Sequence, residues 1–560
     1  MTSTADIFTA PPVAVPDVAR RSITTFRRQL WVLVLAVTLV AGGLRAASAG
    51  HMASQDTALW MARSEVFSDA LRTGHLEDAS ASTLAAGTMP GTTVMWVGSI
   101  ARAVNAAGIS AGVWASDSPD ARGSWRTLTI AQVGIAIVCA LLIGLITYLV
   151  GQWTMNWYAA FFAGLFLATE PWLVALGAEL HTDEMSALFG AAGILALAYA
   201  LGVPDTRVRP HNTTLWAVVA GILFVQAPLT KLPGLGLGLG FAGVAAWAAI
   251  REHARGRDTR RPDLRAATIA FVAAAITVPI AYPAMLVAPV DQWRDLMHSF
   301  SMGGTGHLQF FRGTITPTPG PTFYLVALPW RMTPWLLVGI TLGIPAALAF
   351  RRIRLHAVIL IAAALPLALY MSTAAKQFDR YSLVFYVPLI LAAAIGLGDG
   401  VRRLTGSARG VVVATMAVVG VVAVAVSTAQ VPTGTAYYNP LFGGTKGAQN
   451  VLLIGNGEGV REAVDLIARR VGGKCDGVTV SGAEVLATLH VPCSQPPAKG
   501  VPPRFSIVYI ANAQRVVPGR AEAFTALREP VGTVTVHGVV YASVWEDKRP
   551  DTVKRQPTSN

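Results

Sequence analysis

Long apolar stretches, separated by short polar segments, run through the first 430 residues of the chain. A helix needs about 20 mostly apolar residues to cross a bilayer. The pattern therefore predicts an all-α polytopic membrane protein with about eleven transmembrane helices. The predicted spans are residues 29–48, 127–150, 156–170, 184–203, 213–230, 232–250, 266–288, 333–350, 357–374, 382–398 and 410–430.

The tail from residue 431 to residue 560 follows a different pattern. Residues 459–471 have helical spacing, and strand-like patterns lie on both sides of them. We therefore expect a small α/β domain. Its sequence GNGEG (455–459) lacks the full GxGxxG pattern of a dinucleotide-binding turn. This favours a structural turn in a non-catalytic domain that helps to bind an acceptor. The predicted strands are residues 451–455, 478–482, 506–513 and 534–545.

Basic residues mark one side of the predicted membrane domain. Four arginines precede the first span, and every loop expected on the same side is basic. Such loops are normally cytoplasmic. The net charge of +13 therefore indicates a topology and not a nucleic-acid partner. The basic positions are Arg20, Arg21, Arg27 and Arg28, then Arg207 and Arg209, residues 251–265 and 351–354, and Arg402, Arg403 and Arg409.

This topology divides the chain into three parts in the plasma (inner) membrane. Residues 1–28 form a cytoplasmic segment, residues 29–430 form the membrane domain, and residues 431–560 form an extracytoplasmic domain. Two long loops of the membrane domain, 49–126 and 289–332, lie outside. An alternative is a signal peptide cleaved after Ala47-Ser48-Ala49. That alternative also places residue 50 onward outside.

Only 13% of the residues are charged, compared with about a quarter in soluble domains. Three cysteines are too few for a disulfide framework. Cys139 lies in an apolar span and is expected to serve packing. Cys475 and Cys493 fall in the outer domain, where disulfides persist. We predict that these two form a disulfide.

The polar side chains of the membrane domain gather in its outer loops. From residue 127 onward the predicted spans carry almost no charge away from their ends. Because intramembrane charges usually mark ion or proton pathways, this argues against a coupled transporter. A cluster at the outer lipid boundary suits a substrate with a polar head and a lipid tail. The clustered residues are Asp56, Arg63, Glu170, Glu179, His181, Asp183, Glu184, Lys231, His307, Arg331, Lys376, Asp379 and Arg380.

Three of these positions have a structural alternative. Asp56 precedes an amphipathic stretch (54–74) that is typical of a helix on a membrane surface, so it could be an N-cap. Thr182 could cap the next span, with Asp183 in its first turn. Lys231 could extend to the lipid interface or contact a phosphate.

An ordered set of motifs covers nearly the whole chain. The motifs are Asp56…Arg63-Ser64…Phe67…Ala70-Leu71, MPGTTVMWVG (89–98), EPWL…HTDE (170–184), LTKLP (229–233), GHLQFFRGTITPTPGPTFY (306–324), RMTP (331–334), KQFDRY (376–381) and YYNPLFGG…GNGEG (437–459). This ordered set resembles the protein O-mannosyltransferase and aminoarabinose-transferase group of GT-C glycosyltransferases. It departs from the group at Thr57, where an Asp-Glu pair is usual, and at Met89, where a His is usual.

The resemblance implies a GT-C fold and an inverting transfer of a sugar from a polyprenyl-phosphate donor to an extracytoplasmic acceptor. Asp56 is then the general base. Arg380 has a structural alternative as the partner of Asp379 or Asp183. The implied phosphate-binding residues are Lys231, Arg331, Lys376 and Arg380. The implied substrate-pocket residues are Arg63, His181, Asp183, His307 and Gln309.

Other partners follow from the same interpretation. Membrane lipids surround the chain, and no cofactor is assigned, with a divalent metal as an open alternative. The missing second acidic residue at Thr57 argues against a metal or acceptor role at that position. A flippase or transporter of lipid-linked saccharides is the alternative function. An assembly protein with a sensing outer domain is a further one.

Overall fold

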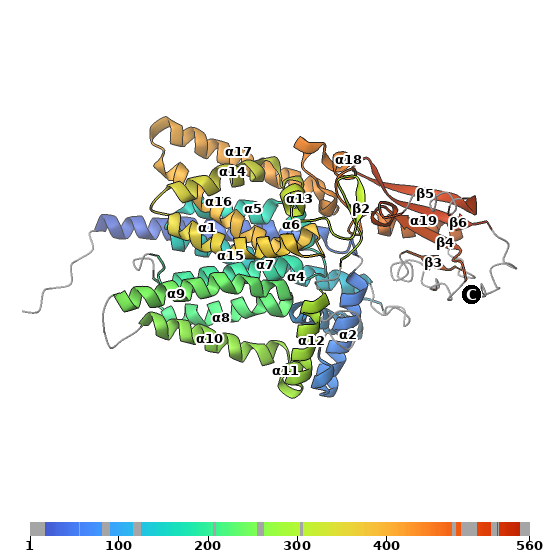
Figure 1. Cartoon of the computed structure of the whole chain (residues 1–560), viewed down its shortest axis with the longest axis horizontal. Coiled ribbons are helices and arrows are strands. Elements are labelled where there is room, and N and C mark those ends of the chain that lie inside the picture. Colours follow the sequence, from blue (N-terminus) through green and yellow to red (C-terminus); the bar gives the residue numbers. More distant parts are fainter. Residues whose placement is uncertain are drawn as a thin grey trace, which may run out of the picture.

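The chain forms an elongated helical bundle, with a small domain that contains a sheet beyond one end of it (Figure 1). We call this end, where the C-terminal domain lies, the domain end of the bundle. The computed structural model describes residues 17–54, 56–80, 90–115, 125–204, 209–254, 262–302, 306–472, 478–482, 495, 501–516, 524 and 526–548.

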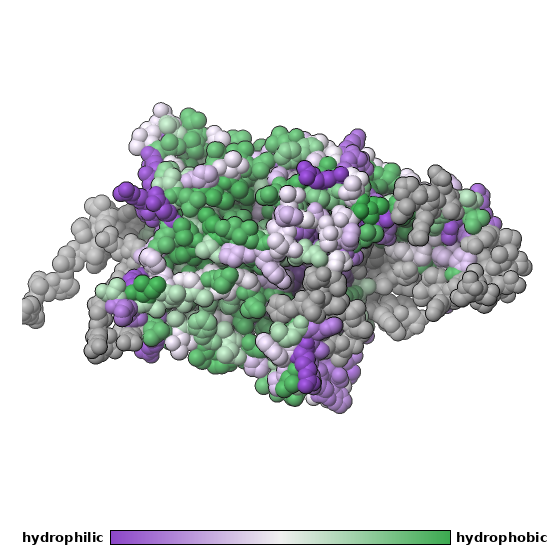
Figure 2. All heavy atoms as spheres, viewed as in Figure 1, coloured by the Kyte–Doolittle hydropathy of each residue, from purple (hydrophilic) through white to green (hydrophobic). Residues whose placement is uncertain are grey.

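Eight of the predicted spans are confirmed as helices that are long and apolar enough to cross a membrane. Together with hydrophobic side chains over the flank of the bundle (Figure 2), they establish a multi-pass membrane protein. They are α1 (Asp17–Ser48), α4 (Trp125–Thr154), α8 (Thr213–Thr230), η3 with α9 (Leu232–Leu237 and Gly238–Ala254), α10 (Pro262–Ala281), α15 (Arg354–Thr373), η4 with α16 (Asp379–Ser382 and Leu383–Arg403) and α17 (Gly406–Gln430).

The other three predicted spans are also helices. Two of them are shorter apolar helices, whereas the third, Asp183–Ala200, has 18 residues, as α8 does, but is not among the eight candidate spans. The three helices are α5 (Trp157–Thr169), α7 (Asp183–Ala200) and α14 (Pro334–Ala349). The 13 residues of α5 rise only about 20 Å, which is less than the hydrocarbon core of about 30 Å. A break at Glu170 separates α5 from the short helix α6 (Pro171–Leu176).

Small residues allow the helices to pack closely. Helix α7 is buried along nearly its whole length, and it packs against α4, α8 and α16. Helices α14 and α16 meet where a Cβ on Gly396 would lie 1.9 Å from the Gly343 carbonyl oxygen. Close backbone approach of this kind is a general way to hold helices together in a membrane.

Arginines surround two buried aspartates at the end of the bundle away from the C-terminal domain. Asp263 pairs with Arg209 and, at 2.7 Å, with Arg251. Asp399 accepts hydrogen bonds from Arg402 at 2.7 Å and Arg403 at 2.9 Å. The pairs of Asp263 therefore tie α10 to α9 and to the segment before α8, whereas these two hydrogen bonds of Asp399 lie within α16.

The two long loops predicted at 49–126 and 289–332, with the residues that lead into the second, contain helices and a hairpin. Helix α2 occurs where an amphipathic helix is predicted, but its best-buried face carries Trp60, Ser64 and Phe67, which pack on α3. Leu59 and Val66 are only partly covered. The elements of these loops are α2 (Thr57–Thr73), η1 (Leu76–Asp78), α3 (Thr92–Ser110), α11 (Ala284–Val287), α12 (Pro289–Met302), β1 (Gln309–Phe311), β2 (Thr314–Thr316) and α13 (Phe323–Arg331).

The C-terminal domain has the α/β character that the sequence predicts. Its four-stranded sheet has the order β3-β4-β6-β5, with β3 parallel to β4 and the other pairs antiparallel. Helix α19 packs on β5 and β6. The elements are η5 (Gly434–Ala436), η6 (Pro440–Phe442), α18 (Gly444–Ala448), α19 (Val460–Val471), β3 (Val480–Ser481), β4 (Phe505–Tyr509), α21 (Ile510–Ala513), β5 (Arg528–Val536) and β6 (Val539–Asp547).

Three strand predictions in this domain are wrong in detail. The single strand predicted at 534–545 is two antiparallel strands, because β5 ends at Val536 and β6 begins at Val539 after a tight turn. Residues 451–455 do not form a strand, because only Leu452 makes a bridge, to Phe311 of β1, before the glycine-rich turn begins. The strand predicted at 506–513 ends at Tyr509, where α21 begins. Cys475 and Cys493 lie outside the described residues, so their disulfide stays a prediction.

Candidate active site

A cavity of about 740 Å³ opens at the domain end of the bundle. Its wall is assembled from outer loops, helix ends and the C-terminal domain. Every residue that the sequence assigns to phosphate binding lines it, as do most of the residues assigned to the substrate pocket. The predicted residues in the wall are Asp56, Arg63, His181, Lys231, His307, Gln309, Arg331, Lys376 and Arg380.

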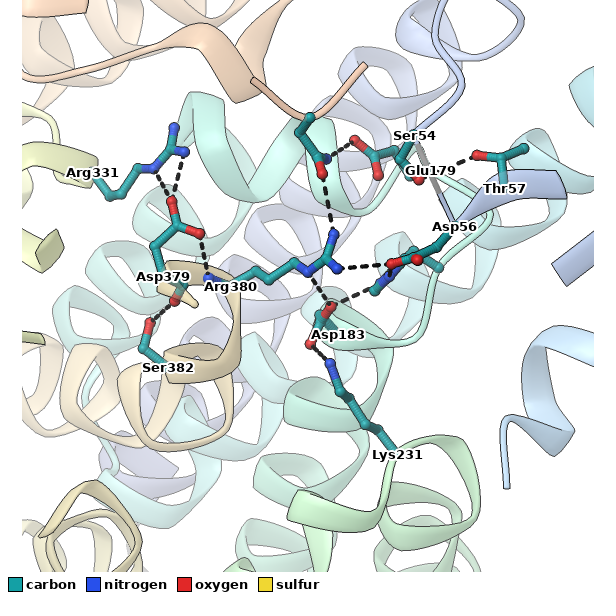
Figure 3. A network of polar contacts seen from close by, with 12 residues as sticks. Ser54, Asp56, Thr57, Glu179, Asp183, Lys231, Arg331, Asp379, Arg380 and Ser382 are labelled. Carbon is teal, nitrogen blue, oxygen red and sulfur yellow. Dashed lines mark hydrogen bonds and ion pairs between the residues drawn. The ribbon is translucent and has the colours of Figure 1, made fainter. Parts of the chain in front are cut away.

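Asp56 is not the helix cap that its position allows. It precedes α2, but its side chain makes no capping hydrogen bond. Its carboxylate instead lies 3.1 Å from His181 Nε2 and accepts a hydrogen bond of 2.7 Å from Arg380 (Figure 3). Burial favours the neutral acid, but the hydrogen bond to His181 and the charge of Arg380 outweigh it and hold the pKa of Asp56 well below its usual range.

His181 joins two carboxylates. Its Nε2 faces Asp56, and its Nδ1 lies 2.7 Å from an Asp183 oxygen. Burial disfavours the charged ring, but the Asp183 carboxylate outweighs burial and raises the pKa of His181. Thr182 makes no capping hydrogen bond, so this loop serves the site and not the start of α7.

Lys231 lies inside the site and not at the lipid interface. Only 4% of the residue is exposed, at the turn between α8 and η3. Its ammonium pairs with Asp183 (Figure 3). It also lies 4.2 Å from the centre of the Tyr381 ring. A buried ammonium needs such partners, because an unpaired charge is very costly in a dry environment.

Arg380 is the centre of the polar network in Figure 3. Its guanidinium contacts Asp56 at 2.7 Å and Asp183 at 3.8 Å. Its backbone N–H donates to Asp379. Arg380 therefore pairs with Asp183, as its structural alternative requires, and it also reaches the candidate base.

Arg331 is more fully occupied than the sequence suggests. It pairs with Asp379 at 2.6 Å and donates to the carbonyl oxygens of Thr435 and Tyr437. Its guanidinium also lies 4.0 Å from the Tyr438 ring centre. Although Arg331 touches the cavity, these contacts make it a tie between the membrane domain and the segment that follows α17.

Lys376 and Arg515 have no carboxylate partner among the described residues. Both line the cavity on the side of His307, and their charges, together with burial, lower the pKa of that imidazole. Arg515 follows α21 of the C-terminal domain. An anion bound here would meet two cations that are not already neutralised.

Two residues of the cavity wall were missed by the sequence analysis. Asn456, in the GNGEG turn, accepts a hydrogen bond of 3.1 Å from Arg380. Arg515 comes from a segment with no recognisable motif, and nothing in its surroundings in the sequence indicates a site. The signal for Asn456 was present in the turn sequence, but was interpreted as structural alone.

Two buried glutamates lie close in sequence to His181 and Asp183, but their contacts are with other helices and not with the cavity. Glu184 pairs at 2.5 Å with Arg45 of α1, and both side chains are almost completely buried. Glu170 accepts two hydrogen bonds of 2.8 Å from Thr333 at the start of α14. Neither residue lines the cavity.

The cavity has an apolar side that continues between α15 and η3 with α9. Leu235, Leu239 and Tyr370 line this side. These three residues are 51%, 60% and 64% exposed, respectively. These residues belong to helices that are long and apolar enough to cross a membrane. The polar network and an exposed apolar surface therefore border the same cavity. The apolar lining consists of Leu232, Pro233, Leu235, Leu239, Pro366, Leu367 and Tyr370.

Across the described part of the chain, no group of three or more His, Cys, Asp or Glu side chains is arranged to hold a metal ion. In the cavity, the oxygens of Asp56 and Asp183 are instead engaged by Arg380, Lys231 and His181.

Comparisons with known proteins find similar structures at low sequence identity. ArnT from Cupriavidus metallidurans, solved with undecaprenyl phosphate bound, is 16% identical, over 92% of this chain and 97% of its own, with a TM-score of 0.48. AglB from Archaeoglobus fulgidus, an oligosaccharyltransferase solved with an inhibitory peptide and a dolichol-phosphate, is 13% identical over 82% of this chain and 63% of AglB, with a TM-score of 0.42. Both belong to the GT-C superfamily. The sequence matches no protein-family model and has no significant match to a curated protein.

Proposed function

We propose that this protein is an inverting glycosyltransferase that moves a sugar from a polyprenyl-phosphate donor to an extracytoplasmic acceptor. One observation carries the proposal. A single cavity joins an ionised carboxylate, several cations and an exposed apolar wall on helices that could cross a membrane. A lipid-linked sugar phosphate has matching parts, because its chain is apolar, its phosphate is anionic and its sugar needs a nearby base.

The donor is placed by its chemistry. The polyprenyl chain lies along the apolar side between α15 and α9, near Leu235 and Leu239. Its phosphate lies toward Lys376 and Arg515, whose charges are not neutralised by described carboxylates. Cations held near a leaving phosphate stabilise the negative charge that develops as its bond to the sugar breaks.

The reaction then needs one base and one displacement. The acceptor hydroxyl attacks the anomeric carbon from the face opposite the phosphate, and its proton passes to Asp56. The bond between the anomeric carbon and the phosphate oxygen breaks, and its electron pair leaves with the polyprenyl phosphate. The configuration at the anomeric carbon inverts.

Arg380 orients the base. Its guanidinium and the His181 ring both contact Oδ2 of Asp56. These contacts hold the carboxylate in its ionised form and fix its direction, so that Oδ1 can take the proton of the acceptor hydroxyl.

A transfer assay tests the function. The purified chain in nanodiscs is given a panel of polyprenyl-phosphate sugars and a membrane extract as the acceptor source. We expect release of polyprenyl phosphate and a labelled product from at least one donor. If the chain binds polyprenyl phosphate but turns over none of the donors, the proposed transferase activity is refuted.

Lys376 provides a sharper test of the donor site. The Lys376→Gln change removes one cation that has no described ion-pair partner, so the loss falls on the ligand. We expect the dissociation constant for polyprenyl phosphate to rise about 10- to 100-fold, since a hydrogen bond to a charged group contributes about 1.5–3 kcal/mol. The measurement is titration in nanodiscs.

A matched control is Lys446→Gln, which changes an exposed lysine of α18 away from the cavity. It should leave the dissociation constant unchanged. Equal affinity in the Lys376 and Lys446 variants would place the phosphate elsewhere.

The proposal also fixes an orientation in the plasma membrane. The basic loops at the end away from the C-terminal domain are placed in the cytoplasm by the positive-inside rule, together with residues 1–28. The membrane domain (29–430) then delivers residues 431–560 to the outside. A periplasm-dependent reporter fused after residue 430 should be active, and one fused after residue 405 should be inactive. The reverse result would invert the topology.

A further inference from the structure

The glycine-rich turn of the C-terminal domain reaches into the polar network. Gly455, Gly457 and Gly459 have φ angles of +101°, +112° and +76°, which favour glycine. A Cβ on Gly457 would lie 2.2 Å from the Ala53 carbonyl oxygen. The turn therefore presses against the segment that leads to Asp56.

Asn456, at the tip of this turn, bridges two charged side chains of the membrane domain. Its Oδ1 accepts from Arg380 at 3.1 Å, and its Nδ2 donates to Glu179 at 2.7 Å. Burial raises the pKa of Glu179 to about 8. Glu179 is therefore mostly neutral at pH 7 and does not compete with Asp56 for the guanidinium.

The core of the C-terminal domain fixes Asn456 in turn. Glu458 is fully buried and accepts hydrogen bonds from the Asn456 backbone N–H at 2.5 Å and from the Tyr509 hydroxyl at 2.7 Å. The Tyr509 hydroxyl accepts from the Gly457 N–H at 2.8 Å. Because Tyr509 belongs to β4, the sheet sets the position of the Asn456 side chain.

We propose that Asn456 is a positioning residue, through which the C-terminal domain completes the active site by holding Arg380 in line with Asp56. The inference rests on the proposed function. Arg380 contacts two carboxylates, and Asn456 is a neutral partner that fixes its direction without neutralising its charge. A chain without this contact leaves the guanidinium free to turn between Asp56 and Asp183. The domain thereby takes part in catalysis as well as in acceptor binding.

The first test is Asn456→Ala. Loss of the hydrogen bond to a charged group should lower kcat about 10- to 100-fold, while the chain still inserts and binds polyprenyl phosphate. Asn450→Ala is the matched control, since Asn450 is an exposed residue of the same segment and lies outside the cavity wall. It should keep the parental kcat.

A rescue variant separates positioning from a general effect on folding. Asn456→Gln keeps a neutral amide, whose oxygen can accept from Arg380 and whose nitrogen can donate to Glu179, so most of the kcat lost in Asn456→Ala should return. Asn456→Leu has a similar size but no polar group, and it should stay slow.

A second measurement does not depend on turnover. Modification of Arg380 by phenylglyoxal, followed by mass spectrometry, should become several-fold faster in Asn456→Ala and return to the parental rate in the rescue variant. Modification of Arg331 should not change. Parental kcat and parental Arg380 reactivity in Asn456→Ala would overturn the inference. A parental chain without transfer activity would refute the proposed function instead, and the labelling would still decide whether Asn456 holds Arg380.

Discussion

Asp56→Asn is expected to lower the rate of sugar transfer about 10²–10⁴-fold, the range for loss of a general base. Asn keeps the size of Asp and its ability to accept a hydrogen bond from Arg380, but it takes up no proton from the acceptor hydroxyl. The loss corresponds to a barrier about 3–5 kcal/mol higher. It should appear in single-turnover transfer with donor prebound.

Donor binding and folding should be almost unaffected by this change. The Asn side chain still accepts a hydrogen bond from Arg380 but no longer neutralises its charge. Affinity for the anionic polyprenyl phosphate should therefore stay the same or increase. The matched control is Asp69→Asn in α2, the helix that Asp56 precedes. The Asp69 side chain is 52% exposed, and among the described residues its ion-pair partner is Arg72. Transfer by the Asp56 variant within a few-fold of the parent would leave the base unassigned, with Asp183 as the next candidate.

The hydrophobic pattern was sufficient for the membrane domain because its helices are local features. Each span needs only its own run of apolar residues, and the loop charges then set the parity. The same reasoning fails for length, since α5 contains 13 residues where the apolar run suggests a longer helix. Glu170 and Pro171 end it, and the hydrogen bonds from Thr333 that bury Glu170 are not visible in a local pattern.

The candidate site was predictable as a set but not in its internal roles. Ends of different helices converge at the domain end of the bundle, so charged residues at those ends were expected to meet. Which cation is neutralised depends on contacts between distant parts of the chain. Arg380 and Asp56 are 324 positions apart. Arg331 and Lys376 therefore look equivalent in the sequence, although only Arg331 carries a carboxylate partner in the described structure.

Asp56 and Asn456 show a second limit, because one local pattern serves two purposes. An aspartate before a helix is equally suited to capping and to a site that the helix start presents. A Gly-Asn-Gly turn is equally suited to reversing the chain and to delivering the Asn side chain to a partner. Only the absence of a capping bond at Asp56 and the contact from Arg380 to Asn456 distinguish these uses.

Asp183 and Glu184 show a third limit of the sequence pattern, since the side chains of neighbouring residues on a helix point about 100° apart. Asp183 faces Lys231 and His181 in the cavity wall, whereas Glu184 faces Arg45 inside the bundle. Two adjacent acids in one first turn therefore have unrelated roles. This difference leads to an expectation about stability and not about catalysis.

Glu184→Gln should destabilise the fold by about 3–5 kcal/mol, the usual cost of leaving a buried charge without its partner. Arg45 is fully buried and keeps its carbonyl contacts to Leu167 and Ala168, but these do not neutralise its charge. The measurement is unfolding in a fixed detergent mixture, with activity compared at a temperature where both chains are folded. Glu184→Gln combined with Arg45→Met should recover much of the loss, because a buried pair replaced by uncharged groups is often near neutral. Parental stability with a selective loss of transfer would instead place Glu184 in the active site beside Asp183.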